Sequence, residues 1–143
     1  MSTVAKVLLN KASQDVATIT PDATVLEAIA LMASKGIGAI VVVEHEQVVG
    51  IVSERDYTRK IALMARTSQQ TTVSEIMTSR VITVCRSHRV DQCLELMTDK
   101  HLRHLPVVED GKLIGLISIG DLVKATMEDQ KKLIEQLQQY ISG

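Results

Sequence analysis

The same run of residue types occurs twice, each time at the end of an apolar segment. It reads Gly50-Ile51-Val52-Ser53-Glu54-Arg55-Asp56 and Gly115-Leu116-Ile117-Ser118-Ile119-Gly120-Asp121. A glycine lets a ligand or another stretch of backbone approach closely, and a serine at a helix start places its hydroxyl beside unpaired N–H groups. Those N–H groups and the helix dipole favour an anion such as phosphate. An aspartate three residues after the serine would lie on the first turn, where its carboxylate can accept two neighbouring hydroxyls such as those of ribose.

Each motif also fits a purely structural role. A serine followed by an acid at the third helical position is close to a capping box, which only begins a helix. One match to such a motif is weak support for a binding site, because short motifs often match by chance. Two matches at equivalent positions favour binding, and the sequence leaves both interpretations open.

The two motifs belong to an internal repeat, which organises the chain. When the sequence is shifted by 65 residues, residues 16–60 align with residues 81–125 without a gap, and twelve pairs are identical. Each copy predicts a short strand, an amphipathic helix with apolar residues at i, i+3, i+4 and i+7, an antiparallel hairpin and a second helix. The short strands are expected at Thr18-Ile19 and Thr83-Val84.

Further helices are expected outside the repeats. A short helix is predicted over residues 2–9, another from Thr72 with Glu75 in a capping box, and a long or kinked one after Asp121.

A three-stranded sheet with two helices cannot cover both of its faces, so we expect the copies to pack about a pseudo-twofold axis. The predicted fold class is α/β, with two β-α-β-β-α repeats, each a small three-stranded sheet with two helices. Repeat 1 with the N-terminal helix takes residues 1–65, a polar linker takes 66–72, and repeat 2 with the C-terminal helix takes 73–143.

Composition narrows the classes of function. The chain has 143 residues, 16 Lys+Arg against 17 Asp+Glu and 45% hydrophobic residues, as in one soluble globular domain. A net charge of −1 and the absence of Phe and Trp argue against general nucleic-acid binding. No apolar run approaches the ~18 residues of a membrane span. No export signal is visible, so we expect a cytoplasmic protein without a membrane partner.

A metal site or a catalytic thiol is the next alternative. Two cysteines and three histidines fall within twenty residues, at Cys85, His88, Cys93, His101 and His104. Cys85 and His88 have the two-to-four-residue separation common in zinc sites. Cys93 aligns with Ala28 on the expected buried face of a helix, which favours a small apolar role. Because no nucleophile, base and oxyanion donor occur together, we predict no catalytic residue, no metal, no catalytic cofactor and no enzymatic activity.

The chain resembles a tandem pair of CBS domains, the unit also called a Bateman module, from residue 5 to about residue 125. The two Gly-h-h-Ser-x-x-Asp motifs, in which h is apolar, and the strand Leu105-Pro106-Val107-Val108 carry the resemblance. It implies a stand-alone sensor of adenosine-containing ligands such as AMP, ADP, ATP, S-adenosylmethionine or NAD, bound in the cleft between the repeats. It also implies a homodimer, often a flat disc of four repeats, and signal transduction through the dimer or an unidentified regulated protein. The alternative is a ligand-free dimerisation or adaptor domain.

The resemblance also implies roles for individual residues. Asp56 and Asp121 would hold ribose hydroxyls, and Ser53 and Ser118 would lie near phosphate. The adenine would be bracketed by the backbone of Ala17, Thr18, Ile82, Thr83, Gly38, Ala39, Arg103 and His104, usually from the opposite repeat. On that pattern the Asp56 site receives Arg103 and His104, which can pair with phosphate, whereas the Asp121 site faces Gly38 and Ala39 and lacks those cations. Arg55 is a further candidate for phosphate, with a solvated role as its alternative.

Overall fold

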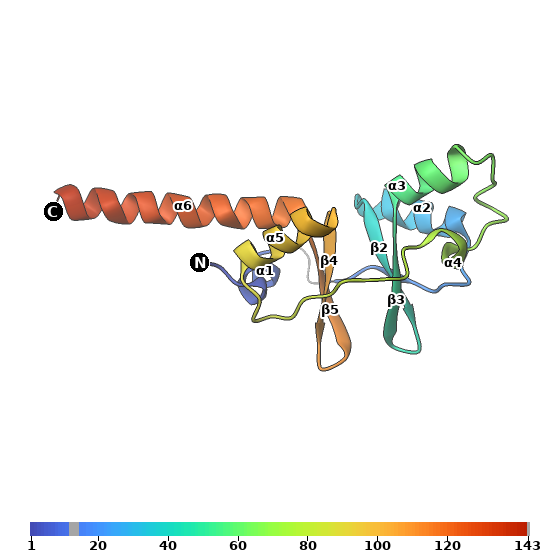
Figure 1. The fold of residues 1–143 in the computed structure, drawn as a ribbon, viewed down its shortest axis with the longest axis horizontal. Coiled ribbons are helices and arrows are strands. Elements are labelled where there is room, and N and C mark those ends of the chain that lie inside the picture. The colour runs from blue at the N-terminus through green and yellow to red at the C-terminus, as the bar shows by residue number, and fades with distance from the viewer. Residues whose placement is uncertain (12–14, 143) are drawn as a thin grey trace. The chain divides into compact units, whose positions relative to one another are not determined.

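The computed structural model describes residues 1–11 and 15–142, which group into two compact units (Figure 1). Unit 1 contains residues 1–15, 83–109 and 114–143, and unit 2 contains residues 16–82 and 110–113. The predicted α/β class is confirmed, since two small sheets are combined with helices. The compact units divide the chain differently from the repeats, because the N-terminal segment groups with the second repeat.

Unit 2 holds the first repeat and a three-stranded sheet. Its elements are β1 (Thr18–Ile19), α2 (Val25–Lys35), β2 (Ala39–Glu44), β3 (Gln47–Ser53), α3 (Glu54–Tyr57), the π-helical turn η1 (Thr58–Ala62) and α4 (Val73–Ile76). The strand order is β1-β2-β3, with β1 parallel to β2 and β2 antiparallel to β3. The short helix predicted after Thr72 is therefore confirmed, and it lies in the unit of the first repeat.

Helix α2 follows from local sequence signals. The hydroxyl of Thr24 accepts a hydrogen bond from the Glu27 N–H, and the Glu27 carboxylate accepts one from the Thr24 N–H, which completes the expected capping box. The helix ends at Gly36, whose φ of 65° suits a residue without a Cβ. Its apolar face is buried and forms one core with the sheet, η1 and α4, made of Val25, Ala28, Met32, Ile40, Val42, Val52, Ile61, Val73 and Ile76.

Unit 1 holds the second repeat and a two-stranded sheet. Its elements are α1 (Val4–Leu9), α5 (Val90–Lys100), β4 (His104–Glu109), β5 (Lys112–Ser118) and α6 (Ile119–Ser142). The strand predicted at Thr83-Val84 is reduced to one parallel bridge, between Val84 and Val107. In the first sheet Thr18 pairs with Val41, and Pro106 takes the position of Val41 in the second repeat. Proline has no N–H to donate, which explains why the pairing does not extend.

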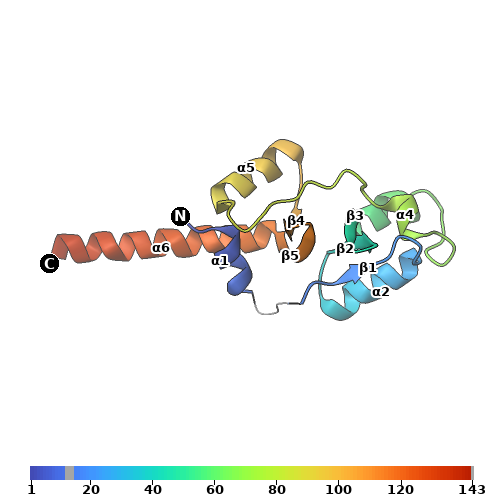
Figure 2. The ribbon, with the colours of Figure 1, turned by 90° about the horizontal axis from the view of Figure 1, so that it is seen from below.

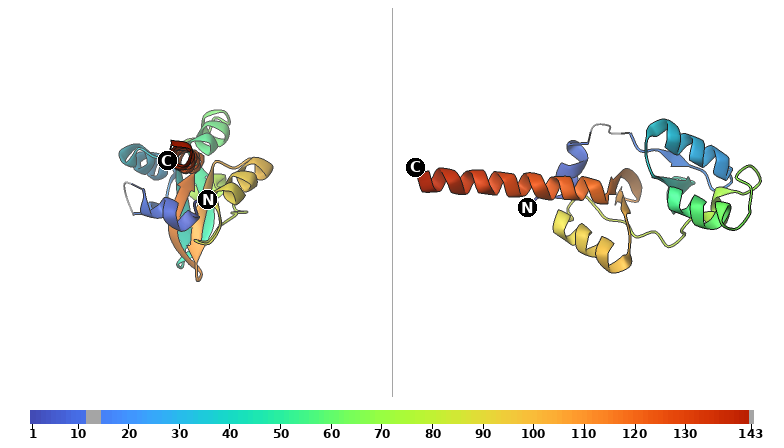
Figure 3. Two further views of the ribbon diagram at one scale, coloured as in Figure 1. Left: turned by 90° about the vertical axis from the view of Figure 1, so that its left-hand side faces the viewer. Right: turned by 90° about the horizontal axis from the view of Figure 1, so that it is seen from above.

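Helix α6 is the long C-terminal helix that the sequence predicts. Helices α1 and α5 lie against opposite sides of its first half (Figures 2 and 3). Its second half extends past the other elements of unit 1 (Figure 1). An apolar stripe at heptad-like spacing stays 45–83% exposed along it, formed by Ile119, Val123, Met127, Ile134, Leu137 and Ile141. The stripe is therefore not buried against the chain's own described residues.

Candidate functional site

The first motif places Ser53 and Asp56 in a completed capping box at the junction of β3 and α3. The Asp56 N–H donates to Ser53 Oγ at 3.2 Å, while Ser53 N–H and Oγ–H donate to Asp56 Oδ2 at 2.9 and 3.1 Å. The next N–H, of Glu54, donates to the Gly38 carbonyl at 3.1 Å. These bonds fix the carboxylate of Asp56 on the first turn of the helix.

The second motif repeats this geometry at the junction of β5 and α6. Ser118 N–H donates to Asp121 Oδ2 at 2.8 Å, and Asp121 N–H donates to Ser118 Oγ at 3.1 Å. The Ile119 N–H donates to the Arg103 carbonyl at 2.9 Å, as Glu54 does to Gly38. The structural role that the sequence left open is thus observed in both repeats.

Capping leaves binding capacity on both carboxylates. An ionised carboxylate offers about four acceptor positions on two oxygens, and the cap uses only Oδ2. Oδ1 of Asp56 lies 3.5 Å from the Lys60 ammonium. Oδ1 of Asp121 accepts no hydrogen bond from any residue within 1–11 or 15–142. Helix capping and ligand binding are therefore compatible at these positions.

Each carboxylate also has a lysine partner that the sequence analysis did not identify. Lys60 Nζ donates to the Ile76 carbonyl at 2.7 Å while it faces Asp56. Lys11 Nζ donates to Asp121 Oδ2 at 2.9 Å and to the Leu116 carbonyl at 2.8 Å. The i, i+4 spacing of Asp56 and Lys60 is a readable signal, whereas Lys11 and Asp121 are 110 residues apart and leave none.

The Lys11 contact sets the electrostatics of the second motif. Burial raises the pKa of Asp121, but hydrogen bonds from Lys11 and Ser118 together with the lysine charge outweigh it, so the pKa lies below its ordinary value. Burial lowers the pKa of His104, and the charges of Lys11 and Arg103 add to this effect against the opposing influence of Asp121. His104 is therefore mainly neutral at pH 7. Arg103 and His104, which the sequence analysis assigned to the Asp56 site, act together with Lys11 in the electrostatics around Asp121.

The remaining predicted residues are distributed over the two units. Gly38 and Ala39 lie beside Ser53, since Ala39 pairs with Ser53 in the sheet. Thr18 begins β1 in that same unit and Ala17 precedes it, and Ile82 and the exposed Arg55 belong to this unit as well. Thr83, Arg103 and His104 belong to unit 1 with Ser118 and Asp121. The assignment of Arg103 and His104 to the Asp56 site stays a prediction.

The motif glycines are explained by packing of the chain itself. A Cβ on Gly50 would collide with the side chain of Met77 and lie 3.2 Å from the Thr78 carbonyl oxygen. A Cβ on Gly115 would collide with the side chain of Leu8. In both repeats the close approach comes from the segment that precedes a repeat, so neither glycine is evidence of a ligand.

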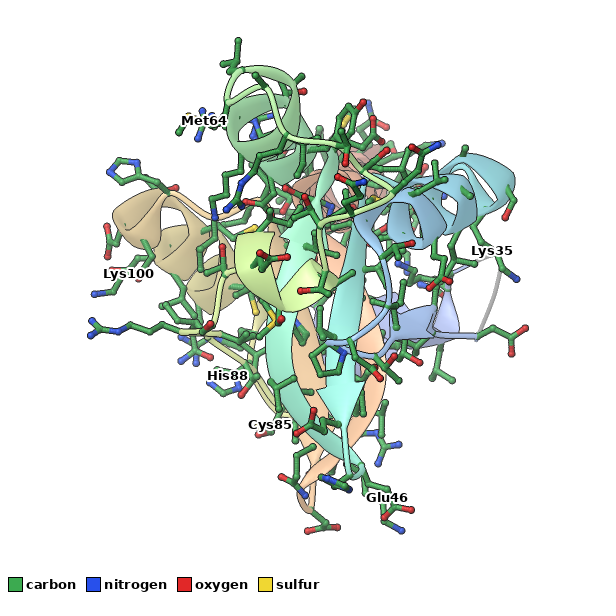
Figure 4. The ribbon with its side chains drawn as sticks, turned by 90° about the vertical axis from the view of Figure 1, so that its right-hand side faces the viewer. Lys35, Glu46, Met64, Cys85, His88 and Lys100 are labelled. Atoms are coloured by element: carbon green, nitrogen blue, oxygen red, sulfur yellow. The ribbon has the colours of Figure 1, made fainter. Side chains whose placement is uncertain are left out.

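The two cysteines lie in different environments, one partly exposed and one buried. Cys93 is buried on α5, and burial raises its pKa to about 11, which agrees with the expected apolar role. Cys85 Sγ lies 3.1 Å from Ser87 Oγ and 3.2 Å from His88 Nδ1, and hydrogen bonds from Ser87 lower its pKa (Figure 4).

The described residues contain no group of three or more His, Cys, Asp or Glu that could hold a metal ion. Within the same residues no helix is long and apolar enough to cross a membrane.

Comparison with known proteins identifies the repeat. Residues 4–63 and 73–128 each match the family described as CBS domain. The mitochondrial CBS domain-containing protein CBSX3 of Arabidopsis thaliana is 41% identical over 129 residues, which are 87% of this chain and 63% of that protein. The chain thus spans less than two thirds of this relative.

Solved structures agree with this family. A Burkholderia ambifaria protein with CBS domains, assigned to signal transduction, has 51% identity and a TM-score of 0.86, covering 90% of this chain and 96% of that chain. The CBS domain pair of protein MJ0100, in complex with 5′-methylthioadenosine and S-adenosyl-L-methionine, shares the fold with 24% identity and a TM-score of 0.77, covering 90% and 98%. The chain therefore belongs to the CBS domain family and carries two CBS domains in tandem.

Proposed function

We propose that this protein is a non-catalytic regulatory module that binds an adenosine-containing nucleotide at its Ser–Asp motifs. The position of the Asp56 and Asp121 carboxylates carries this proposal. Each is partly buried on the first turn of a helix and is held there by the serine of its own motif through Oδ2. Oδ1 lies outside the cap, and a fixed carboxylate of this kind can accept the two hydroxyls of a ribose.

The known ligands of a structural neighbour support the chemical class. Both molecules bound to the MJ0100 CBS pair contain an adenosine group. The candidates for this chain are AMP, ADP, ATP, S-adenosylmethionine and NAD, all of which offer the same ribose diol. Basic side chains for phosphate are present in each unit, with Arg55 and Lys60 in unit 2 and Arg103 and Lys11 in unit 1.

We further propose that the protein acts as a homodimer. The exposed apolar stripe of α6 runs from Ile119 to Ile141, about 33 Å at 1.5 Å per residue. Monomeric proteins rarely expose large apolar patches, and the spacing of three, four or seven residues suits pairing with the same helix of a second copy. An unidentified regulated protein and a cytoplasmic location belong to the same proposal, and the Arabidopsis relative is mitochondrial by name.

A ligand-free dimerisation or adaptor domain is the second candidate. Both capping boxes are complete without a ligand, and the α6 stripe offers a dimer contact independent of the motifs. On this alternative Asp56 and Asp121 only begin their helices.

Thermal unfolding with a ligand panel separates the two candidates. The panel is adenosine, AMP, ADP, ATP, S-adenosylmethionine and NAD, with GMP as a control for the base. A ligand at 100 times its Kd should stabilise the folded protein by about 2.7 kcal/mol. Asp56→Asn and Asp121→Asn keep the size of the side chain and should each reduce this stabilisation. Asp91→Asn changes an exposed acid on the first turn of α5 and serves as the matched control. If no adenosine ligand at millimolar concentration moves the unfolding curve, the adaptor candidate replaces the proposal.

A further inference from the structure

Lys11 places a cation of the protein itself on the carboxylate proposed to bind ribose. Its ammonium bonds Asp121 Oδ2 at 2.9 Å and the Leu116 carbonyl at 2.8 Å, and both side chains are only 31% and 26% exposed. The same carboxylate oxygen already accepts the Ser118 N–H. A ribose diol that bonds both oxygens of this carboxylate must compete with the ammonium for Oδ2, so Lys11 opposes diol binding at Asp121.

The segment that supplies Lys11 is fastened to α6 at both of its ends. At the first end, Ser2 N–H and Oγ–H donate to the two oxygens of Asp129 at 2.9 and 2.7 Å. At the second end, Lys11 reaches Asp121, eight residues before Asp129 on the same helix. Between them lies α1, which packs beside α6 (Figure 2).

The two ends of this N-terminal segment, residues 2–11, are held differently. Near the first end, backbone bonds also run from Val4 N–H to the His88 carbonyl and from Ala5 N–H to the Arg86 carbonyl, at 2.9 and 3.1 Å. Val4 and Val7 are buried. At the other end, the Lys11 ammonium bonds Asp121 of α6 and Leu116 of β5, and Leu8 packs against Gly115. A ligand on the Asp121 carboxylate would therefore break the bond of Lys11 to α6 and leave residues 4–7 in place.

The lysine of the first repeat engages its carboxylate less closely. Lys60 stands on the same helical segment as Asp56, four residues later, and its ammonium lies 3.5 Å from Oδ1, beyond a short hydrogen bond. Lys60 also bonds the Ile76 carbonyl at 2.7 Å, as Lys11 bonds that of Leu116 at 2.8 Å. The two motifs therefore differ in how strongly a lysine holds the aspartate.

We propose that Lys11 is an internal competitor for Asp121, so that a ligand at the second motif displaces the ammonium from this carboxylate. This rests on the proposed function and adds its regulation. Nucleotide occupancy thereby breaks the bond between Lys11 and α6. The second motif binds a neutral nucleoside more weakly than it would without Lys11.

Adenosine titration of Lys11→Met tests the competition, because adenosine has no phosphate that a lysine could attract. The variant is made in an Asp56→Ala background, which leaves only the second motif. Removing a partly exposed ion pair should tighten adenosine binding about five-fold, equivalent to about 1 kcal/mol. Lys11→Arg should restore the weaker affinity, and Lys35→Met, at an exposed lysine of α2, should leave it unchanged.

Amide hydrogen exchange gives the second readout. Lys11→Met without ligand, and adenosine bound to the Lys11 protein, should both speed exchange of the residue 11 N–H, which donates to the Leu8 carbonyl, while residues 4–7 stay protected. Unchanged or weaker adenosine binding in Lys11→Met, or equal protection of that N–H in all states, overturns the competitor role while adenosine binding itself stands. Absence of adenosine binding to both proteins overturns the proposed function and the competitor role together.

Discussion

Asp121→Asn should destabilise the folded protein more than the equivalent Asp56→Asn. Asparagine keeps an acceptor for the Ser118 N–H but loses the negative charge. The variant then loses the Lys11 ion pair, up to about 1 kcal/mol, and the favourable charge at the start of α6, about 0.3–1 kcal/mol. Asp56→Asn loses a similar helix contribution but only the looser 3.5 Å contact with Lys60. We expect a loss of about 2 kcal/mol for Asp121→Asn and about 1 kcal/mol for Asp56→Asn.

Urea unfolding at several pH values measures both losses. The pKa of Asp121 is lowered in the folded protein, so its contribution is complete above the unfolded pKa of about 3.9. It is lost as pH falls through the lower folded pKa. The gap between wild type and Asp121→Asn should therefore be equal at pH 7 and pH 5 and should close only below pH ~4. Equal losses for the two variants, or a gap that closes near pH 6, would refute the role given to Lys11 and Asp121.

Three further outcomes are expected. In the native protein at pH 8, iodoacetamide should label Cys85 but not the buried Cys93, whose pKa is about 11; mass spectrometry showing early Cys93 labelling would contradict this. Gly50→Ala should cost about 1–3 kcal/mol in urea unfolding because its Cβ would meet both Met77 and the backbone carbonyl of Thr78, whereas Gly120→Ala, whose Cβ would lie 3.6 Å from Ser118 Oγ, should cost nothing. Leu137→Glu should shift light scattering from dimer to monomer with little change in unfolding of the single chain, and a dimer that survives it excludes the α6 contact.

Local patterns and the repeat predicted most of the fold. Thr24 with Glu27 and Thr72 with Glu75 marked helix starts correctly, because a capping box is decided within four residues. Asp110-Gly111 marked the second hairpin turn, where both residues have positive φ. His45 and Glu46 adopt the same turn without its favoured residues, so there the flanking strands determine the conformation (Figure 4 labels Glu46 at the tip).

The structural features that the sequence did not predict depend on contacts between residues distant in sequence. The Thr83-Val84 strand shortens because of Pro106, more than twenty residues later. The N-terminal segment groups with the second repeat, which no local pattern in residues 2–11 indicates. Lys11 is the clearest example at the candidate site, because a lone lysine after a short helix gives no sign of a carboxylate 110 residues away.

Calorimetric titration of the wild type and the Asp56→Asn/Asp121→Asn double variant tests the central claim most directly. The titrant is whichever panel ligand stabilises the wild type most. Losing a charged acceptor for the ribose hydroxyls costs about 1.5–3 kcal/mol per site, a loss of affinity of roughly 10–150-fold. We predict saturable binding to the wild type and affinity weakened by at least tenfold in the double variant, with Asp91→Asn unchanged. Equal affinity in wild type and double variant would show that the two aspartates are helix caps only and would contradict nucleotide recognition by the Ser–Asp motifs.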